Sequence, residues 1–240
     1  FSDSISGLFG SHSTAKLSGD DYHLWDRHKP MWQVMTHLNP MSNDLEGFSS
    51  DLTSLTDGKE ITARYYNHLT GKMSKHIKIK SNDFIFASGL HALYLPQLRD
   101  CYNLKIYLDM DEDLRRHFKI KRDVDIRGHS LDKVLKSLDA REPDSNKFIR
   151  PQKKNADLIL SIQPIHPNIL KNSTMDIDRK LKVVATTHHG LSQLVLNRAL
   201  VGLCGLHVDM IVSNDGTEVN MRVEGDASFE DIAMAARIVS

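Results

Sequence analysis

Short apolar runs of strand length alternate with longer amphipathic segments along this chain, and this alternation most constrains its fold. Strands are expected at residues 15–18, 83–87, 104–108 and 156–161. Helices are expected at residues 2–9, 44–55, 111–127 and 130–141. The apolar run within 83–87 is expected to be buried on both faces. Strands and helices that alternate on this scale predict an α/β fold with parallel strand pairings.

The pattern changes after residue 165. A strand is expected at 180–187, an apolar helix at 191–203, two alternating strands at 207–212 and 218–223, and a closing helix at 229–239. The sequence Asn214-Asp215-Gly216 between the two alternating strands is typical of a tight β-hairpin. Residues 166–240 are therefore predicted to form a small α+β extension, which packs on the sheet of residues 1–165 or makes a subunit contact.

Composition excludes several classes of function. The 240 residues are 40% apolar, enough for one sizeable core. Lys plus Arg and Asp plus Glu number 31 each, so no basic field favours nucleic acid as the main partner. The apolar runs are too short to span a membrane. Two cysteines give no disulfide framework, and no Cys/His spacing suggests zinc. A cytoplasmic protein without nucleic-acid or membrane partners is expected.

The phrase Leu17-Ser-Gly-Asp-Asp-Tyr-His-Leu-Trp-Asp-Arg27 places polar groups at the carboxyl end of a predicted strand, where open α/β sheets bind ligands. A carboxylate at Asp20 or Asp21 can accept the proton of an attacking hydroxyl. His23 and Arg27 can bind the anionic end of a substrate. The alternative interpretation is a helix N-cap followed by a solvated loop.

A second polar group stands at the end of the predicted helix 111–127. Asp123 and Arg127 are four residues apart and share a helix face, while Arg122 lies about 100° round the helix. The planar guanidinium of arginine suits a phosphate site. An ordinary surface ion pair explains the same spacing.

Two further motifs are weaker by themselves. Arg64-Tyr-Tyr-Asn-His68 is polar and aromatic, and it either lines a sugar pocket or fills a loop. Ser88-Gly89-Leu90-His91 follows the apolar strand, where phosphate-transfer enzymes often carry a carboxylate that organises Mg²⁺. Ser88 can form a hydrogen bond there but brings no negative charge.

Taken in order, these motifs resemble the phosphoribulokinase/uridine kinase family of P-loop kinases, with the phosphoribulokinase branch closer. The resemblance covers about residues 1–165. It rests on Leu17-Ser-Gly-Asp-Asp-Tyr-His, Asp26-Arg27, Leu38-Asn-Pro, Asn43-Asp44, Tyr66-Asn-His-Leu-Thr-Gly71, Gly89-Leu-His91, Arg122-Asp-Val-Asp-Ile-Arg-Gly-His-Ser130 and Phe148-Ile-Arg-Pro-Gln-Lys-Lys-Asn-Ala-Asp157.

The resemblance implies a P-loop-kinase-like, mostly parallel sheet flanked by helices. It also implies an ATP- and Mg²⁺-dependent kinase that transfers the γ-phosphoryl group to a hydroxyl of a pentose phosphate, and a dimer is expected. Asp20 would be the base that accepts the hydroxyl proton, and Asp123 would assist at the metal or the reacting centre. The sugar phosphate would be surrounded by His23, Arg27, Tyr66 and His68. Arg122 and Arg127 would neutralise phosphate charge.

Two departures from the family pattern qualify that expectation. The Gly-rich phosphate loop should immediately precede Phe1, and we expect the natural protein to carry it there. Ser88 stands where the family usually has Glu, which weakens the expected magnesium site. A uridine kinase-like nucleoside kinase and a non-catalytic kinase-fold binding protein therefore remain as alternatives.

Overall fold

The computed structural model describes residues 11–74, 76–165, 181–187, 201 and 205–225. The chain divides into two compact units. The first contains residues 1–103 and 139–155, and the second contains residues 104–138 and 156–240. The predicted helices at 2–9 and 229–239, and most of that at 191–203, lie outside the described residues.

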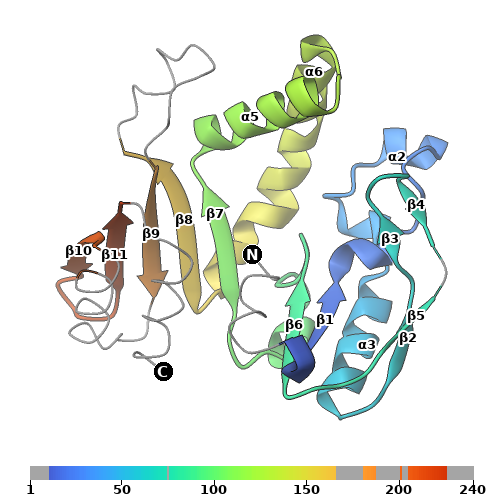
Figure 1. The fold of residues 1–240 in the computed structure, drawn as a ribbon, viewed down its shortest axis with the longest axis horizontal. Helices are drawn as coiled ribbons and strands as arrows, with labels where there is room; N and C mark the ends of the chain where they lie inside the picture. The colour runs from blue at the N-terminus through green and yellow to red at the C-terminus, as the bar shows by residue number, and fades with distance from the viewer. Residues whose placement is uncertain (1–10, 75, 166–180, 188–200, 202–204, 226–240) are drawn as a thin grey trace. The chain divides into compact units, whose positions relative to one another are not determined.

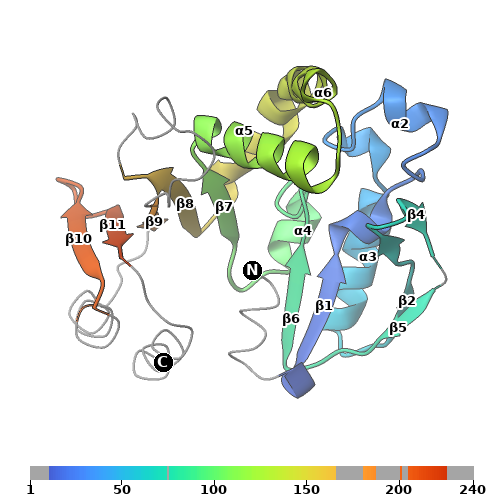
Figure 2. The ribbon, with the colours of Figure 1, turned by 45° about the horizontal axis from the view of Figure 1, so that its top comes forward.

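The first unit is built on a parallel pair of strands. β1 (Thr14–Ser18) runs beside β6 (Phe84–Ser88), with Thr14 opposite Phe84 and Ser18 opposite Ser88. α3 (Leu45–Thr56) and α4 (Pro96–Asp100) lie against this pair (Figure 2). The unit also contains the short helix α2 (Pro30–Val34) and two small antiparallel pairs: β2 (Ile61–Ala63) with β5 (Ile77–Ile79), and β3 (Tyr66–Asn67) with β4 (Lys72–Met73).

Helix α3 begins and packs as the sequence predicts. The Asp44 side chain accepts a hydrogen bond from the Gly47 N–H at 2.9 Å and caps the first turn. Phe48, Leu52 and Leu55 follow at helical spacing and are fully buried. They form the core of the first unit together with Leu17, Tyr22, Ile61, Ala63 and Leu98.

One expectation for the first unit is wrong. Residues 83–87 were expected to be buried on both faces, but Phe84 is 41% exposed and the rest of β6 is half-buried. Among the described residues β6 pairs with β1 alone, so only one of its edges is hydrogen-bonded to another strand.

The second unit is a five-stranded sheet in the order β10-β11-β9-β8-β7 (Figure 1). β7 (Ile106–Met110) and β8 (Leu158–Pro164) are parallel. β9 (Leu181–Thr187), β11 (Val219–Glu224) and β10 (His207–Val212) add to them by antiparallel pairings. The parallel pairs thus fall within residues 1–165 and the predicted hairpin is confirmed. β9, which follows residue 165, pairs with β8, which precedes it, so one sheet extends across this position. A domain boundary at residue 165 stays a prediction.

The helices that follow β7 carry the second predicted polar group. α5 (Glu112–Lys121) is capped by the Asp111 side chain, which accepts a hydrogen bond from the Leu114 N–H at 3.0 Å. It continues into a π-helical turn at Arg122–Ile126, and α6 (Leu131–Asp144) follows. Within the described ranges no helix is both long and apolar enough to cross a bilayer.

Candidate active site

The turn after β1 is positioned by a close approach of two glycines. Gly19 opens a 3₁₀ turn, Gly19–Tyr22, and lies against Gly89 at the end of β6. A Cβ atom added to Gly89 would lie 2.9 Å from the Gly19 Cα, which is closer than side chains allow. The two glycines therefore let the ends of β1 and β6 meet, and they place Asp20 at that end.

The two acidic residues of the turn have different surroundings. The Asp20 side chain is 35% exposed, with His23 Nε2 at 3.7 Å and His68 Nε2 at 3.6 Å from its two oxygens. Asp21 is buried, and its Oδ1 accepts a hydrogen bond from the Tyr66 N–H at 2.6 Å. Burial raises the pKa of Asp21, although this hydrogen bond opposes the effect. Asp21 holds the chain in place, and Asp20 is open to a substrate.

His23 is buried beside an amide and three aromatic rings. Its Nδ1 lies 2.7 Å from Asn43 Oδ1. Its ring meets Trp32 and Tyr66 edge-on at 5.2 Å and His37 at 5.8 Å. Burial lowers the pKa of His23, opposed by the Asn43 hydrogen bond and by the Asp20 carboxylate. The His23 imidazole should therefore stay neutral at a lower pH than an exposed histidine does.

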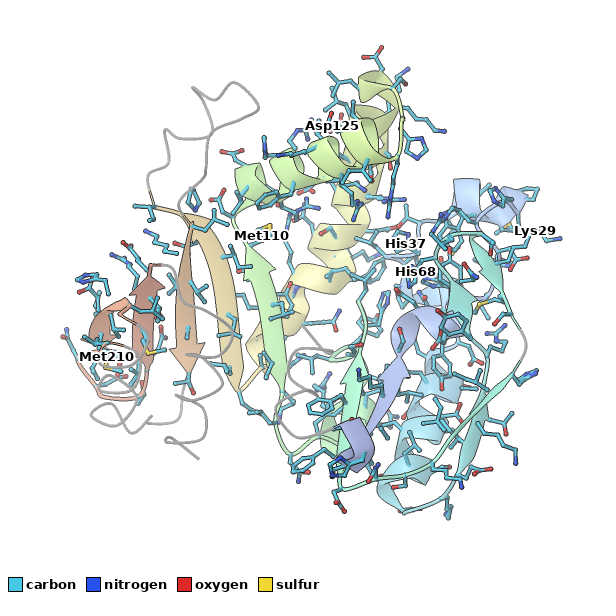
Figure 3. The ribbon with its side chains drawn as sticks, in the orientation of Figure 1. Lys29, His37, His68, Met110, Asp125 and Met210 are labelled. Carbon is cyan, nitrogen blue, oxygen red and sulfur yellow. The ribbon has the colours of Figure 1, made fainter. Side chains whose placement is uncertain are left out.

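Tyr66 places a buried hydroxyl in the cluster. Its ring stacks on Trp32 at 6.3 Å, and the Arg27 guanidinium lies over it at 5.9 Å. The Tyr66 hydroxyl is buried and has no hydrogen-bond partner among the described residues. An unpaired buried hydroxyl costs free energy, so a polar ligand group at this position would stabilise the protein. His37 and His68 lie at the same end of the first unit (Figure 3).

The turn that carries His68 is fixed by local sequence. Asn67 Oδ1 accepts hydrogen bonds from the Leu69 and Thr70 N–H groups at 2.9 and 3.1 Å. Gly71 closes the turn with φ +68°. The Arg27 N–H donates to the Gly71 carbonyl at 2.7 Å, which places the Arg27 side chain beside the turn.

The second polar group is a carboxylate surrounded by cations. Asp123 is buried and accepts hydrogen bonds from Arg122 Nε at 2.9 Å, Arg127 Nη1 at 3.0 Å and Lys119 Nζ at 3.2 Å. Burial raises the pKa of Asp123, but the Arg122 and Lys119 contacts outweigh it and lower the pKa to about 2. About half of each arginine side chain is exposed. Asp123 therefore orients two guanidinium groups that remain open to an anion.

The residues described form no ready-made cluster of metal ligands. Among them, no three His, Cys, Asp or Glu side chains form a metal-binding group. The oxygens of Asp123 are engaged by three cations, and Ser88 adds no charge where a carboxylate was expected. The proposed metal role of Asp123 stays a prediction, which this arrangement does not favour.

The structure brings together most of the residues predicted for the sugar site. Asp20, His23, Arg27, Tyr66 and His68 lie in one cluster of the first unit. Arg122, Asp123 and Arg127 form their own cluster in the second unit.

Sequence reasoning gave no role to Trp32, His37 or Asn43, although Asn43 falls within a motif of the family resemblance. All three side chains contact His23 only because the loops that carry them fold against it. The spacing of residues along the chain therefore gave no signal for Trp32 or His37.

Comparison with known proteins identifies the family of this chain. Residues 5–167 match the family described as "Phosphoribulokinase / Uridine kinase family". The chain is 33% identical to a phosphoribulokinase of Synechocystis over 160 residues, which cover 67% of this chain and 48% of that protein. It is 35% identical to a chloroplastic phosphoribulokinase of Chlamydomonas reinhardtii over 154 residues, 64% of this chain and 41% of that protein. A uridine kinase of Staphylococcus aureus is 33% identical over 153 residues, 62% of this chain and 74% of that protein.

The crystallised phosphoribulokinase of Rhodobacter spheroides superposes with a TM-score of 0.73 at 17% identity, covering 99% of this chain and 88% of that chain. The fold is accordingly that of a P-loop kinase, as expected. The chain belongs to the phosphoribulokinase/uridine kinase family. It spans less than half the length of the phosphoribulokinases of Synechocystis and Chlamydomonas that it matches.

Two buried histidines are expected to make the stability of the protein depend on pH. Burial lowers the pKa of both His23 and His91 from 6.5, opposed in His91 by its hydrogen bond to the Leu38 carbonyl. Below 6.5 the unfolded chain binds more protons at these sites than the folded one. We expect the free energy of unfolding to fall as pH decreases from about 7.5 to about 5.5.

Urea denaturation across this range measures the effect. The variant His91→Gln, which keeps a donor for the Leu38 carbonyl, should show a weaker pH dependence. Stability that rises on acidification would contradict the expectation.

Proposed function

We propose that this chain carries the sugar site of an ATP-dependent kinase that transfers the γ-phosphoryl group to a hydroxyl of a pentose phosphate. The observation that supports this most is the cluster around Asp20. An accessible carboxylate stands between two imidazoles, next to a buried tyrosine hydroxyl without a partner. Membership of the family supplies the reaction class. Mg²⁺ would accompany ATP, and no described residue is assigned to it.

In the proposed reaction one residue of the cluster accepts a proton and others bind the substrate. As a sugar hydroxyl attacks phosphorus, Asp20 accepts its proton, the new O–P bond forms, and ADP leaves with the electrons of the broken bond. The Tyr66 hydroxyl forms a hydrogen bond to the sugar. Arg27, held against the Tyr66 ring, pairs with the phosphate that the sugar already carries.

Arg122 and Arg127 would contribute through charge alone. Phosphoryl transfer depends on alignment and on neutralising negative charge. Asp123 acts in this account as a positioning residue, because it fixes both guanidinium groups through one carboxylate oxygen.

Calorimetric titration with ribulose 5-phosphate, unphosphorylated ribulose and uridine tests the proposal. We expect ribulose 5-phosphate to bind most tightly, and Arg27→Met to weaken that binding by about tenfold or more, since a charge-assisted hydrogen bond is lost. Tighter binding of uridine would favour the nucleoside kinase. Sugar-phosphate binding without phosphoryl transfer in the full-length protein would favour the non-catalytic binding protein.

Gly71 offers a second, more local test. A Cβ atom at Gly71 would lie 2.7 Å from the Arg27 Cβ, and φ is +68° there. Gly71→Ala should therefore displace Arg27 and weaken sugar-phosphate binding several-fold. The left-handed backbone should in addition lower the free energy of unfolding by about 1–2 kcal/mol. Gly58→Ala is the matched control, because Gly58 has φ +81° but no atom within 4 Å of an added Cβ. An equal loss of affinity in both variants would contradict the proposed role of Arg27 in binding the sugar phosphate.

A further inference from the structure

A groove of the first unit lies apart from the Asp20 cluster. It opens between residues 24–31 and β4 and has a volume of about 380 Å³. Small-molecule sites have volumes of about 300–1,000 Å³, so the groove is large enough for a ligand. No residue of the Asp20 cluster lines it, and Lys29, which does, is well separated from His37 and His68 in Figure 3.

Apolar side chains form much of the groove. Leu24 and Met31 are 44% and 39% exposed, and Trp25, Pro30 and Met73 lie beside them. Single exposed apolar residues are ordinary on a protein surface, but several that share one hollow are typical of a binding site. The flexible side chains of the two methionines can adapt to the shape of a ligand.

Two cations of the groove have no counter-ion. Lys29 and Arg64 both line it, and within the described part of the chain neither forms an ion pair. Arg64 is half-buried, and its Nη2 donates a hydrogen bond to the His23 carbonyl at 3.2 Å, which leaves its charge uncompensated. Asp26 also lines the groove but pairs with neither cation. Because a charge that is partly removed from water is stabilised by an opposite charge, the groove favours an anion.

The walls of the groove are held in place without a ligand. The Asp26 Oδ1 atom accepts a hydrogen bond from the Met73 N–H at 2.8 Å and ties the loop to β4. The Lys29 N–H donates to the Asp26 carbonyl at 3.0 Å, and the Leu24 N–H donates to the Ser42 carbonyl at 3.0 Å. A ligand therefore meets a formed site, and little free energy is lost in ordering it.

We propose that this groove is a second ligand site, which binds a small aromatic carboxylate. The planar guanidinium of Arg64 can hold a carboxylate at two points, and Lys29 adds a second positive charge. The ring of the ligand packs against the Trp25 indole and the Leu24 and Met31 side chains. This site shares no lining residue with the sugar site and goes beyond the proposed function.

NMR titration with 2-naphthoate tests the site through two indole N–H signals. Trp25 lines the groove and Trp32 lies beside His23, and replacing each by Phe assigns its signal. We expect 2-naphthoate to shift the Trp25 signal until it saturates and to shift the Trp32 signal much less. An excess of ribulose 5-phosphate should not displace it. Absence of a saturable Trp25 shift, or displacement by ribulose 5-phosphate, would overturn the proposal.

An uncharged analogue tests whether the groove selects an anion. 2-Naphthamide has the same ring without the charge, and should bind about tenfold more weakly because charge-assisted hydrogen bonds are lost. Equal affinities for the acid and the amide would show an unselective apolar surface and would overturn the claim of an anion site.

Substitution of the two cations separates their charge from their part in the fold. Arg64→Met should weaken 2-naphthoate binding about tenfold, and Lys29→Met several-fold. The Lys29 side chain makes no hydrogen bond or ion pair with a described residue, so its loss should leave the fold unchanged. Lys78→Met is the matched control, because Lys78 lies outside the groove in the same unit and pairs with Glu60 at 3.0 Å. Equal affinities in Lys29→Met and Lys78→Met would contradict the site.

Discussion

Replacing Asp20 by asparagine is expected to lower the turnover of the proposed phosphoryl transfer by the full-length protein by about 10²–10⁴-fold, the usual contribution of a general base. The amide has nearly the same shape, so it still fits between the His23 and His68 rings. It cannot accept the hydroxyl proton. Affinity for the sugar phosphate should change little, which steady-state kinetics shows as a loss in kcat with KM nearly unchanged.

Asp57→Asn is the matched control for this experiment. Asp57 lies at the exposed end of α3 in the same unit and pairs with Lys59 at 2.9 Å. Its loss should leave turnover unchanged. Full activity in Asp20→Asn would remove Asp20 from the base role, and an equal loss in both variants would point to a general effect of charge.

Phe48→Ala is expected to lower the free energy of unfolding by about 3–5 kcal/mol, as for other fully buried aromatic residues. Phe48 is 1% exposed and packs against the Tyr22 ring at 5.0 Å. It also lies beneath Gly19, at 3.9 Å from an added Cβ. The cavity left by the ring would therefore loosen the turn that carries Asp20, and substrate binding should weaken together with stability.

Chemical denaturation measures the change, with Phe84→Ala as the matched control. Phe84 belongs to the same unit but is 41% exposed, so the same substitution should cost clearly less. The loss of unfolding free energy in Phe48→Leu should lie between those of Phe48→Ala and Phe84→Ala. Equal losses at positions 48 and 84 would contradict the assignment of Phe48 to the core.

Local signals in the sequence predicted much of the fold. Asp44 marks the start of α3 because a side-chain oxygen before an apolar stripe caps a helix. Asn214-Asp215-Gly216 marks the β10–β11 hairpin, where Gly216 adopts φ +70°. These features depend on residues close together in the chain, and they were confirmed.

Contacts between distant segments were harder to predict. Asn43 reaches His23 across 20 residues, and Tyr66 reaches Asp21 across 45. The periodicity of apolar residues indicates only which face of a helix or strand is buried. It does not indicate which loop supplies a buried amide. The π-helical turn at Arg122–Ile126 is a local feature that helical spacing also did not predict. An α-helix would turn Arg122 away from Arg127, yet the structure brings both to Asp123.

Phosphorus NMR of the full-length protein with ATP and ribulose 5-phosphate tests the central claim most directly. We expect the γ-phosphoryl signal of ATP to disappear while ADP and a second phosphate ester on the pentose appear. Phosphorylation of uridine in place of ribulose 5-phosphate, or no transfer to either acceptor, would contradict it.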